Sequence, residues 1–318
     1  MIHVLCLNPA IDKLFEIDGF TAGEDYPGQR PRVAVGGKGV NVARVISQLG
    51  EDVRLYAFLG EDGGEAVRRE MTARCSCVFV SVPGACRTTI NILDRAGGRE
   101  TVITEAGPRA DREQTRRLLA ELDRALRPGD MVCCSGSIIP GAPEDFYAAV
   151  SRMAVAAGAR CALDCNARTL PPSLAGASYA LAKPNERELA ALTGQPRTQD
   201  ARRLRMMARE GMPQAERVLV SMGAAGGVLM TPGGAWRASL PPVRVVSSVG
   251  SGDATLAGAL SALARGMDDA QTLRLAMACG VANAALGGNG SIERQELERV
   301  MENIAVEELH DKGGQFPC

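Results

Sequence analysis

Short apolar runs alternate with amphipathic segments along most of the chain. The apolar runs are rich in Val, Leu, Ile, Ala and Cys and predict central strands at residues 3–7, 53–59, 131–134, 161–164, 180–183 and 217–221. Apolar residues at helical spacing predict helices at residues 40–49, 65–74, 112–126, 144–157, 186–193, 252–264, 269–286 and 293–303. This alternation predicts an α/β fold with a doubly wound, mostly parallel sheet covered by helices on both faces.

Two stretches, residues 13–35 and 86–105, interrupt this alternation. They hold strand-like pieces at 14–17, 32–35, 88–93 and 101–104 with no helix between them. We interpret them as a small β-sheet that projects from the core as a lid, and hairpin excursions are the alternative. The predicted core is then discontinuous, with residues 1–12, 36–85 and 106–308, and residues 309–318 form a flexible tail. A lid of this kind could exclude water from a group-transfer reaction.

Composition narrows the class of protein. The chain has 318 residues, a net charge of -1, 46% hydrophobic and 3% aromatic residues. It lacks the basic blocks and aromatic stripes of nucleic-acid-binding proteins, and no apolar run has the length of a membrane span or signal sequence. Many of the ten cysteines lie in apolar runs, which indicates reduced core thiols in a cytoplasmic protein. With two histidines, His3 and His310, a histidine-based triad or zinc helix is not supported.

The sequence Val-Gly-Ser-Gly-Asp-Ala-Thr at residues 249–255 is a candidate catalytic turn. We predict a strand at 243–246 before it and a helix after it, so that Asp253 falls in the first helical turn. Helix N-termini present free N–H groups to anions, and glycines allow a close approach. A carboxylate there can accept a proton from an attacking hydroxyl. The alternative is a simple helix cap.

A second glycine cluster spans residues 36–44, Gly-Gly-Lys-Gly-Val-Asn-Val-Ala-Arg. It differs from a Walker loop because Gly39 follows Lys38, and it does not fit the Gly-x-Gly-x-x-Gly dinucleotide motif. Glycines before a helix often form only a turn. Together with Lys38 and Asn41, they favour a site for a polar ligand.

These two clusters resemble the N-terminal and C-terminal signatures of the PfkB/ribokinase-like carbohydrate kinases. Four further segments resemble motifs of the same family: Leu-Asn-Pro-Ala-Ile-Asp at 7–12, Ser-Gly-Ser-Ile-Ile-Pro-Gly at 135–141, Lys-Pro-Asn-Glu-Arg-Glu at 183–188 and Ser-Met-Gly-Ala-Ala-Gly at 221–226. The resemblance covers nearly the whole chain. Its overall pattern is similar to the subgroup of 1-phosphofructokinases and tagatose-6-phosphate kinases.

The resemblance implies a role for each matching residue. Asp253 would be the base that takes a proton from the acceptor hydroxyl, and the backbone amides of Gly250, Ser251, Gly252 and Asp253 would form an anion hole for the phosphoryl group of ATP. Glu188 would bind Mg²⁺ through water. The implied nucleotide-binding residues are Lys183, Asn185, Ser221, Gly223, Gly226 and Asn283, and the implied acceptor-binding residues are Asp12, Gly36, Gly37, Lys38, Asn41, Arg87 and Ser137.

Lys38 and Arg87 suggest an acceptor that already carries a phosphate, because fixed cations neutralise its charge. The resemblance implies tagatose 6-phosphate or fructose 1-phosphate, each giving a 1,6-bisphosphate, and a homodimer formed through the lid. Fructose 6-phosphate, an unphosphorylated sugar or a nucleoside are the alternative acceptors, and a non-catalytic sugar-phosphate sensor is an alternative of another class. Two departures affect the acceptor site: Ile138-Ile139 replaces Leu-Pro, and Pro27 stands near a usual lid arginine that Arg30 or Arg32 could replace.

Overall fold

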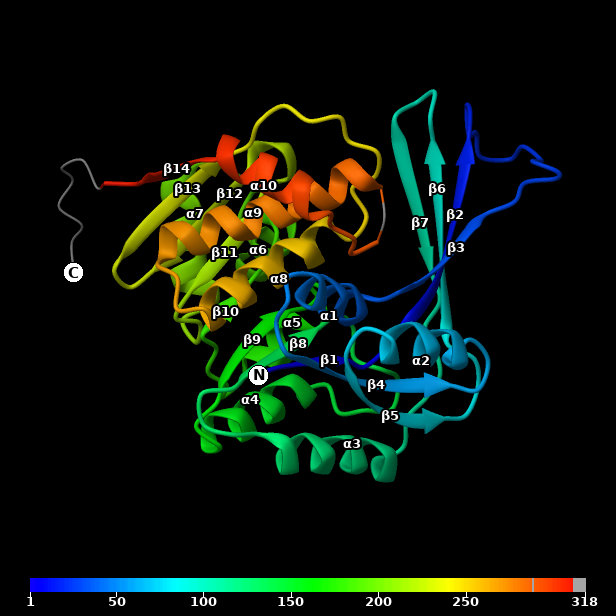
Figure 1. The fold of residues 1–318 in the computed structure, drawn as a ribbon, viewed down its shortest axis with the longest axis horizontal. Helices are drawn as coiled ribbons and strands as arrows, with labels where there is room; N and C mark the ends of the chain where they lie inside the picture. The colour runs from blue at the N-terminus through cyan, green and yellow to red at the C-terminus, as the bar shows by residue number, and fades with distance from the viewer. Residues whose placement is uncertain (288, 311–318) are drawn as a thin grey trace.

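A computed structural model describes residues 1–287 and 289–310, and its main feature is a ten-stranded sheet (Figure 1). The strands are β1 (Ile2–Cys6), β4 (Val53–Gly60), β5 (Ser76–Val82), β8 (Met131–Ser135), β9 (Arg160–Asp164), β10 (Leu181–Ala182), β11 (Val218–Ser221), β12 (Gly227–Thr231), β13 (Gly234–Ser239) and β14 (Ala305–Glu308). Their order is β14-β13-β12-β11-β10-β9-β8-β1-β4-β5. All pairings from β11 to β5 are parallel, and β12, β13 and β14 add antiparallel pairs at one end. The mostly parallel sheet is therefore confirmed.

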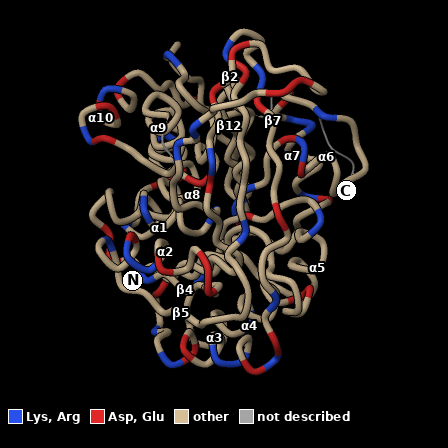
Figure 2. Tube along the Cα trace, turned by 90° about the vertical axis from the view of Figure 1, so that its right-hand side faces the viewer, with Lys and Arg blue, Asp and Glu red and all other residues tan. Residues whose placement is uncertain are grey.

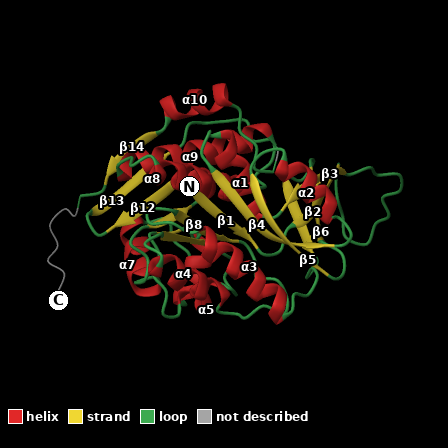
Figure 3. Cartoon of the chain, turned by 60° about the horizontal axis from the view of Figure 1, so that its bottom comes forward, coloured by secondary structure: helices red, strands yellow, loops and turns green. Residues whose placement is uncertain are grey.

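Helices cover both faces of this sheet, as the alternating pattern predicted (Figure 3). One core cluster joins the sheet to α1 (Lys38–Gln48), α2 (Gly64–Thr72), α8 (Ser251–Ala264), α9 (Asp269–Leu286) and α10 (Arg294–Asn303). The other joins it to α3 (Arg112–Ala125), α4 (Phe146–Ala156), α5 (Leu170–Leu174), α6 (Glu186–Thr193) and α7 (Ala201–Gly211). Successive residues of β1 alternate between the clusters, since Val4 and Cys6 belong to the first and Leu5 to the second.

The predicted strand at residues 243–246 is wrong. Pro241 and Pro242 precede it and lack the N–H groups that a ladder needs. Val245 is 59% exposed, and the Val246 N–H donates instead to the Ala284 carbonyl at 2.9 Å. The β-branched run that suggested a strand is therefore a surface loop held against the end of α9. The sequence interpretation also missed β5, β12, β13 and β14, as well as α5 and α7.

A separate four-stranded sheet contains the predicted lid segments. Its strands are β2 (Ala10–Ile17), β3 (Arg32–Gly36), β6 (Arg87–Asp94) and β7 (Arg99–Thr104), in the order β3-β2-β6-β7. The β2–β3 and β6–β7 pairs are antiparallel, whereas β2 and β6 run parallel to each other. Figure 1 shows this sheet standing beside the main body, next to the ends of β1 and β4. The lid is thus a distinct sheet rather than a set of excursions from the main one.

Charged residues are interspersed along the chain, with basic and acidic segments close together (Figure 2). No helix within residues 1–287 and 289–310 combines the length and the apolar character needed to cross a membrane. The nine cysteines of these segments are free thiols, and all but Cys75 and Cys77 are buried. At the end of the described chain, the Leu309 N–H donates to the Ala235 carbonyl at 2.8 Å. The predicted tail beyond His310 lies outside the described residues.

Candidate active site

Asp253 lies in the first turn of α8, where the spacing had placed it. Gly250 is the N-cap and has φ of 79°, a conformation that favours glycine. A Cβ atom on Gly250 would also come within 2.7 Å of the Gly290 nitrogen. The Ser251 N–H donates to the Ser248 carbonyl at 3.2 Å, whereas those of Gly252 and Asp253 have no acceptor in the described part of the chain. This turn therefore offers open N–H groups beside a carboxylate.

The carboxyl group of Asp253 is buried, with 7% of the residue exposed. Its Oδ2 accepts a hydrogen bond from Asn41 Nδ2 at 2.8 Å, across 212 residues of sequence. Burial raises the pKa of Asp253 to about 6, and the nearby positive charge of Lys38 limits the rise. Because Asn41 engages Oδ2, Oδ1 is the oxygen left to accept a proton from another group.

Two lysines meet at a buried carboxylate that the sequence analysis did not select. Asp164, at the end of β9, has Oδ1 3.0 Å from Lys38 Nζ and Oδ2 3.4 Å from Lys183 Nζ. Burial alone would raise the pKa of Asp164, but the charges of Lys183 and Lys38 outweigh it and lower the pKa. Asp164 ends a predicted parallel strand, and this position was the signal available in the sequence, since functional residues gather at the carboxyl ends of such strands.

Lys38 is held among carboxylates. Burial opposes its charged form, yet the charges of Asp164, Asp253 and Glu188 outweigh that effect and raise the pKa of Lys38. Its ammonium group therefore stays charged beside Asp253. In this structure Lys38 is paired with Asp164, whereas Arg87 lines the cleft described below.

Asp12, on β2, lies beside the glycine cluster at the start of α1. Its Oδ2 accepts a hydrogen bond from Asn289 Nδ2 at 2.5 Å, and burial raises the pKa of Asp12. A side chain at Gly36 would collide with the Asp12 carboxylate, and Gly37 has φ of 105° as the N-cap of α1. These glycines thus allow the lid strands and α1 to meet closely around Asp12.

A cleft of about 830 Å³ lies between the start of β6 and the loops after β8 and β9. Arg87 lines it and donates from Nε to the Asn8 carbonyl at 2.9 Å. Ser137 Oγ is buried and has no hydrogen-bond partner in the described residues. Arg168, which the sequence analysis missed, also lines the cleft, together with the carboxylates Glu105 and Glu144. The cleft thus brings two arginines and an unpaired hydroxyl together.

Two of the residues expected at the nucleotide, Asn185 and Ser221, lie next to each other at the ends of β10 and β11. Asn185 caps α6: its Oδ1 accepts from the Glu188 N–H and Glu188 Oε2 accepts from the Asn185 N–H, both at 2.9 Å. Asn185 also forms a bridge with Ser221, the last residue of β11. Asn185 and Glu188 can therefore cap α6 and still take part in ligand binding. The capping box does not use Asn185 Nδ2, and it uses only one oxygen of the Glu188 carboxylate.

The turn after Ser221 depends on two glycines, since Gly223 has φ of 57° and Gly226 has φ of 87°. Asn283, on α9, is fully buried. Its Nδ2 donates to the Val249 carbonyl at 2.9 Å and to Ser251 Oγ at 3.1 Å. Asn283 therefore supports the turn before α8 through its side chain.

No group of three or more His, Cys, Asp or Glu side chains in the described chain could hold a metal ion. Mg²⁺ often keeps several waters and uses one or two carboxylates together with substrate phosphates. Glu188, whose charge acts on Lys38, suits that kind of binding. The site therefore fits an ion that arrives with the nucleotide rather than a closed protein cage.

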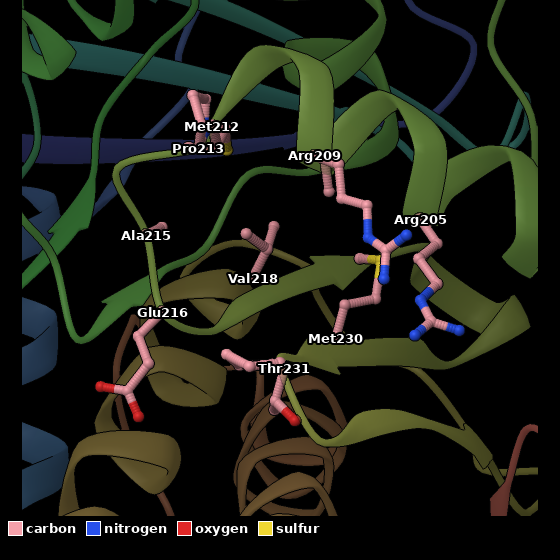
Figure 4. A pocket seen from close by; sticks show the side chains of 11 residues that line it. Arg205, Arg209, Met212, Pro213, Ala215, Glu216, Val218, Met230 and Thr231 are labelled. Atoms are coloured by element: carbon pink, nitrogen blue, oxygen red, sulfur yellow. The ribbon is translucent and has the colours of Figure 1, made fainter. Parts of the chain in front are cut away.

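A second cavity, of about 250 Å³, lies at the start of β11 and the end of β12 (Figure 4). Arg205, Arg209, Met230 and Glu216 are among its lining residues. It contains none of the expected site residues, and it opens at the amino end of β11. Ligands of open parallel sheets bind outside the carboxyl ends of the strands. The Asp253 region is therefore the candidate active site.

Comparisons with known proteins agree with this geometry. Residues 5–294 match the model of the pfkB family of carbohydrate kinases. The tagatose-6-phosphate kinase of Staphylococcus epidermidis is 30% identical over 312 residues, covering 97% of this chain and 100% of that protein. Phosphofructokinase-2 from Escherichia coli has a TM-score of 0.84 at 24% identity, covering 95% of this chain and 98% of that one. The possible 1-phosphofructokinase of Thermotoga maritima has a TM-score of 0.83 at 23% identity, covering 98% and 100%.

The two solved structures show the fold, and the family match and the curated relative show the family. Members of this family are kinases, which use ATP as the phosphoryl donor. The chain therefore belongs to the pfkB family of carbohydrate kinases and is an ATP-dependent carbohydrate kinase.

Proposed function

We propose that this kinase phosphorylates a ketohexose phosphate, tagatose 6-phosphate or fructose 1-phosphate, to the 1,6-bisphosphate. The observation that carries the proposal is one arrangement: a buried carboxylate at an open helix N-terminus, Asp253, with a separate two-arginine cleft nearby. A sugar with a phosphate at one end and a free primary hydroxyl at the other suits both parts. The names of the relatives, tagatose-6-phosphate kinase and possible 1-phosphofructokinase, support the same acceptor class.

In the proposed reaction, Asp253 Oδ1 accepts the proton of the acceptor's primary hydroxyl. The hydroxyl oxygen forms a bond to the γ-phosphorus of ATP while the bond to the ADP oxygen breaks. The open N–H groups of Gly252 and Asp253, with Gly250 shaping the turn, would stabilise the charge on the transferring group. Ser251 contributes less than expected to the anion hole, because its N–H is already bonded to Ser248.

We assign the nucleotide side to Lys183, Asn185, Ser221, Gly223 and Gly226. Asn283 acts there through the turn that it supports, and Glu188 would hold Mg²⁺ through water. When bound, the ion would neutralise phosphate charge. Lys38 is already beside Asp253 and would face the transferring group. We assign the acceptor's sugar hydroxyls to Asp12 and its phosphate to Arg87 and Ser137, with Gly36, Gly37 and Asn41 shaping this part of the site.

A homodimer through the lid is part of the proposal. The edge strands β3 and β7 expose apolar side chains, with Val33 62%, Val102 54% and Ile103 55% exposed. Edge strands with apolar side chains are ready to pair with another chain. Light scattering on the purified protein tests this, and a monomer at micromolar concentration would contradict it.

Replacing Arg87 by Ala is expected to raise KM for the sugar phosphate by roughly 10–100-fold, the equivalent of one lost charge-assisted hydrogen bond. KM for ATP and turnover of a neutral sugar should change little. Arg168→Ala should give a smaller effect in the same direction. Arg116→Ala, at an exposed arginine of α3, is the matched control. Equal losses with phosphorylated and neutral acceptors would contradict the assignment of Arg87 to the phosphate.

The proposed acceptor is tested by ADP release with Mg-ATP and five acceptors: tagatose 6-phosphate, fructose 1-phosphate, fructose 6-phosphate, fructose and ribose. The expected result is the highest kcat/KM with one of the first two. Preference for fructose 6-phosphate or for a neutral sugar would support the alternative kinases. Tight binding of a sugar phosphate without ADP release would support a sensor.

A further inference from the structure

We propose that Arg44 is a positioning residue that orients both the proposed base and the proposed acceptor-binding carboxylate. Its guanidinium group donates to the side-chain oxygen of Asn41 and to the backbone carbonyl of Asn289, and the side chains of these two residues donate to Asp253 and to Asp12. The inference deepens the proposed function and rests on it. Arg44 lies one helical turn after Asn41 on α1 and is almost wholly buried.

All three nitrogens of the Arg44 guanidinium donate hydrogen bonds. Nε donates to Glu70 Oε1 at 2.9 Å, and Nη2 donates to the Val35 carbonyl at 2.8 Å. Nη1 donates to Asn41 Oδ1 at 2.9 Å and also to the Asn289 carbonyl. Because this fork is planar and rigid, fixing Nε and Nη2 also fixes the direction of Nη1. Arg44 therefore supplies a donor at one defined point between α1 and the loop at Asn289.

This donor decides which way the Asn41 amide faces. An amide presents an oxygen at one end and an NH₂ group at the other, and both ends have the same shape. With Oδ1 held by Arg44, Nδ2 points to Asp253. Without Arg44, the amide could turn and bring its oxygen to the carboxylate, which would disfavour the ionised form of Asp253. The identity of the group at Asn41 Oδ1 therefore affects the base directly.

The same nitrogen fixes the loop at Asn289, whose side chain donates to Asp12. This loop packs closely against its neighbours. A Cβ atom on Gly290 would come within 2.7 Å of the Asn41 Cα, and one on Gly250 would come within 2.7 Å of the Gly290 nitrogen. The loop thus packs between α1 and the turn that begins α8. Through this loop, Arg44 connects the acceptor side of the site with the catalytic side.

Arg44→Gln is expected to lower kcat by roughly 10–100-fold, the loss typical of removing a group that orients a ligand at metal sites. It should also raise, by about one unit, the pH at which kcat/KM falls on the acidic side (the acidic limb), because Asn41 no longer favours the ionised form of Asp253. The charged groups around Asp253, namely Lys38, Lys183 and Asp164, stay unchanged in this variant. Arg44→Lys keeps a cation beside Glu70, so it should lose less stability than Arg44→Gln and show the same shift.

The experiment measures kcat/KM against pH for wild type, Arg44→Gln, Arg44→Lys, Asn41→Ala and Asn41→Ala/Arg44→Gln. The acidic limb of the double variant should lie no higher than that of Asn41→Ala alone, because both changes act on this limb through one amide. Arg74→Gln is the control, since Arg74 also pairs with Glu70 but has no bond to Asn41. An unmoved acidic limb in both Arg44 variants, or additive shifts of that limb in the double variant, would overturn the inference. If kcat/KM of Asp253→Asn falls on the acidic side at the same pH as in wild type, Asp253 is not the base.

Discussion

Asp253→Asn is expected to lower kcat by roughly 10²–10⁴-fold, the usual contribution of a general base. Asparagine has nearly the same shape and can still accept the hydrogen bond from Asn41 Nδ2, so the site should remain intact. It cannot take a proton from the acceptor hydroxyl. Single-turnover ADP formation measures the chemical step, and ATP binding measured by calorimetry should change little. Near wild-type turnover would remove Asp253 from the mechanism.

The pH dependence supplies a second signature of the same group. Burial raises the pKa of Asp253 to about 6, and the base acts only when it is ionised. Wild-type kcat/KM is therefore expected to fall as the pH drops through about 6, and the residual activity of Asp253→Asn should lack this limb.

The raised pKa also has a consequence for stability. The folded protein holds this proton more tightly than the unfolded chain, so the stability contributed by Asp253 is present below its ordinary pKa of 3.8 and is lost as the pH rises through about 6. At pH 8, Asp253→Asn should keep or exceed the wild-type melting temperature. A marked drop at pH 8 would contradict this account.

Asp164→Asn is the change expected to cost the most stability. It leaves the ammonium groups of Lys38 and Lys183 in a buried site without the carboxylate that holds them, and breaking a buried ion pair from one side costs about 3–5 kcal/mol. In a chain of this size that corresponds to a fall in melting temperature of roughly 5–15 °C. Since the pKa of Asp164 is lowered, its contribution is complete above its ordinary pKa of 3.8 and is lost only as the pH falls below that value.

Calorimetry across pH 5–9 tests this prediction. Glu298→Gln, which breaks an exposed pair with Arg294, should change the stability by less than about 1 kcal/mol and is the control. ATP should raise the melting temperature of Asp164→Asn more than that of wild type, because phosphate oxygens can replace the missing carboxylate near the lysines. An unchanged melting temperature in Asp164→Asn would show that the two lysines do not depend on it.

Much of the core was predictable because its elements follow local patterns. The runs at residues 3–7 and 53–59 are apolar except for His3 and Arg54, as expected of strands buried on both faces, and they pair as parallel neighbours β1 and β4. The run at 243–246 holds three valines, yet two prolines and the contact with α9 hold it on the surface. A pattern of side chains predicts a strand only when the backbone can also complete a ladder.

The chemistry of the site was predictable where it depends on neighbours in sequence. Small residues around Asp253 indicated an open helix start, and the glycines before Lys38 indicated a close approach of the chain. Spacing within one helical turn determines such features. The same local reasoning could not show that Lys38 pairs with Asp164, because nothing in the sequence shows where a long side chain ends.

The sequence by itself determined the alternating order of the core elements, the lid segments and the two glycine turns, since these depend on periodicity and on residue types close together in the chain. Tertiary structure alone decided the pairings that tune the site. Asp164 meets Lys38 across 126 residues, Asn41 meets Asp253 across 212, and Asn289 meets Asp12 across 277. These contacts arise because the fold brings the end of β9, the starts of α1 and α8 and the lid strand β2 together, and that placement, rather than any local motif, sets the burial and the charge around the base.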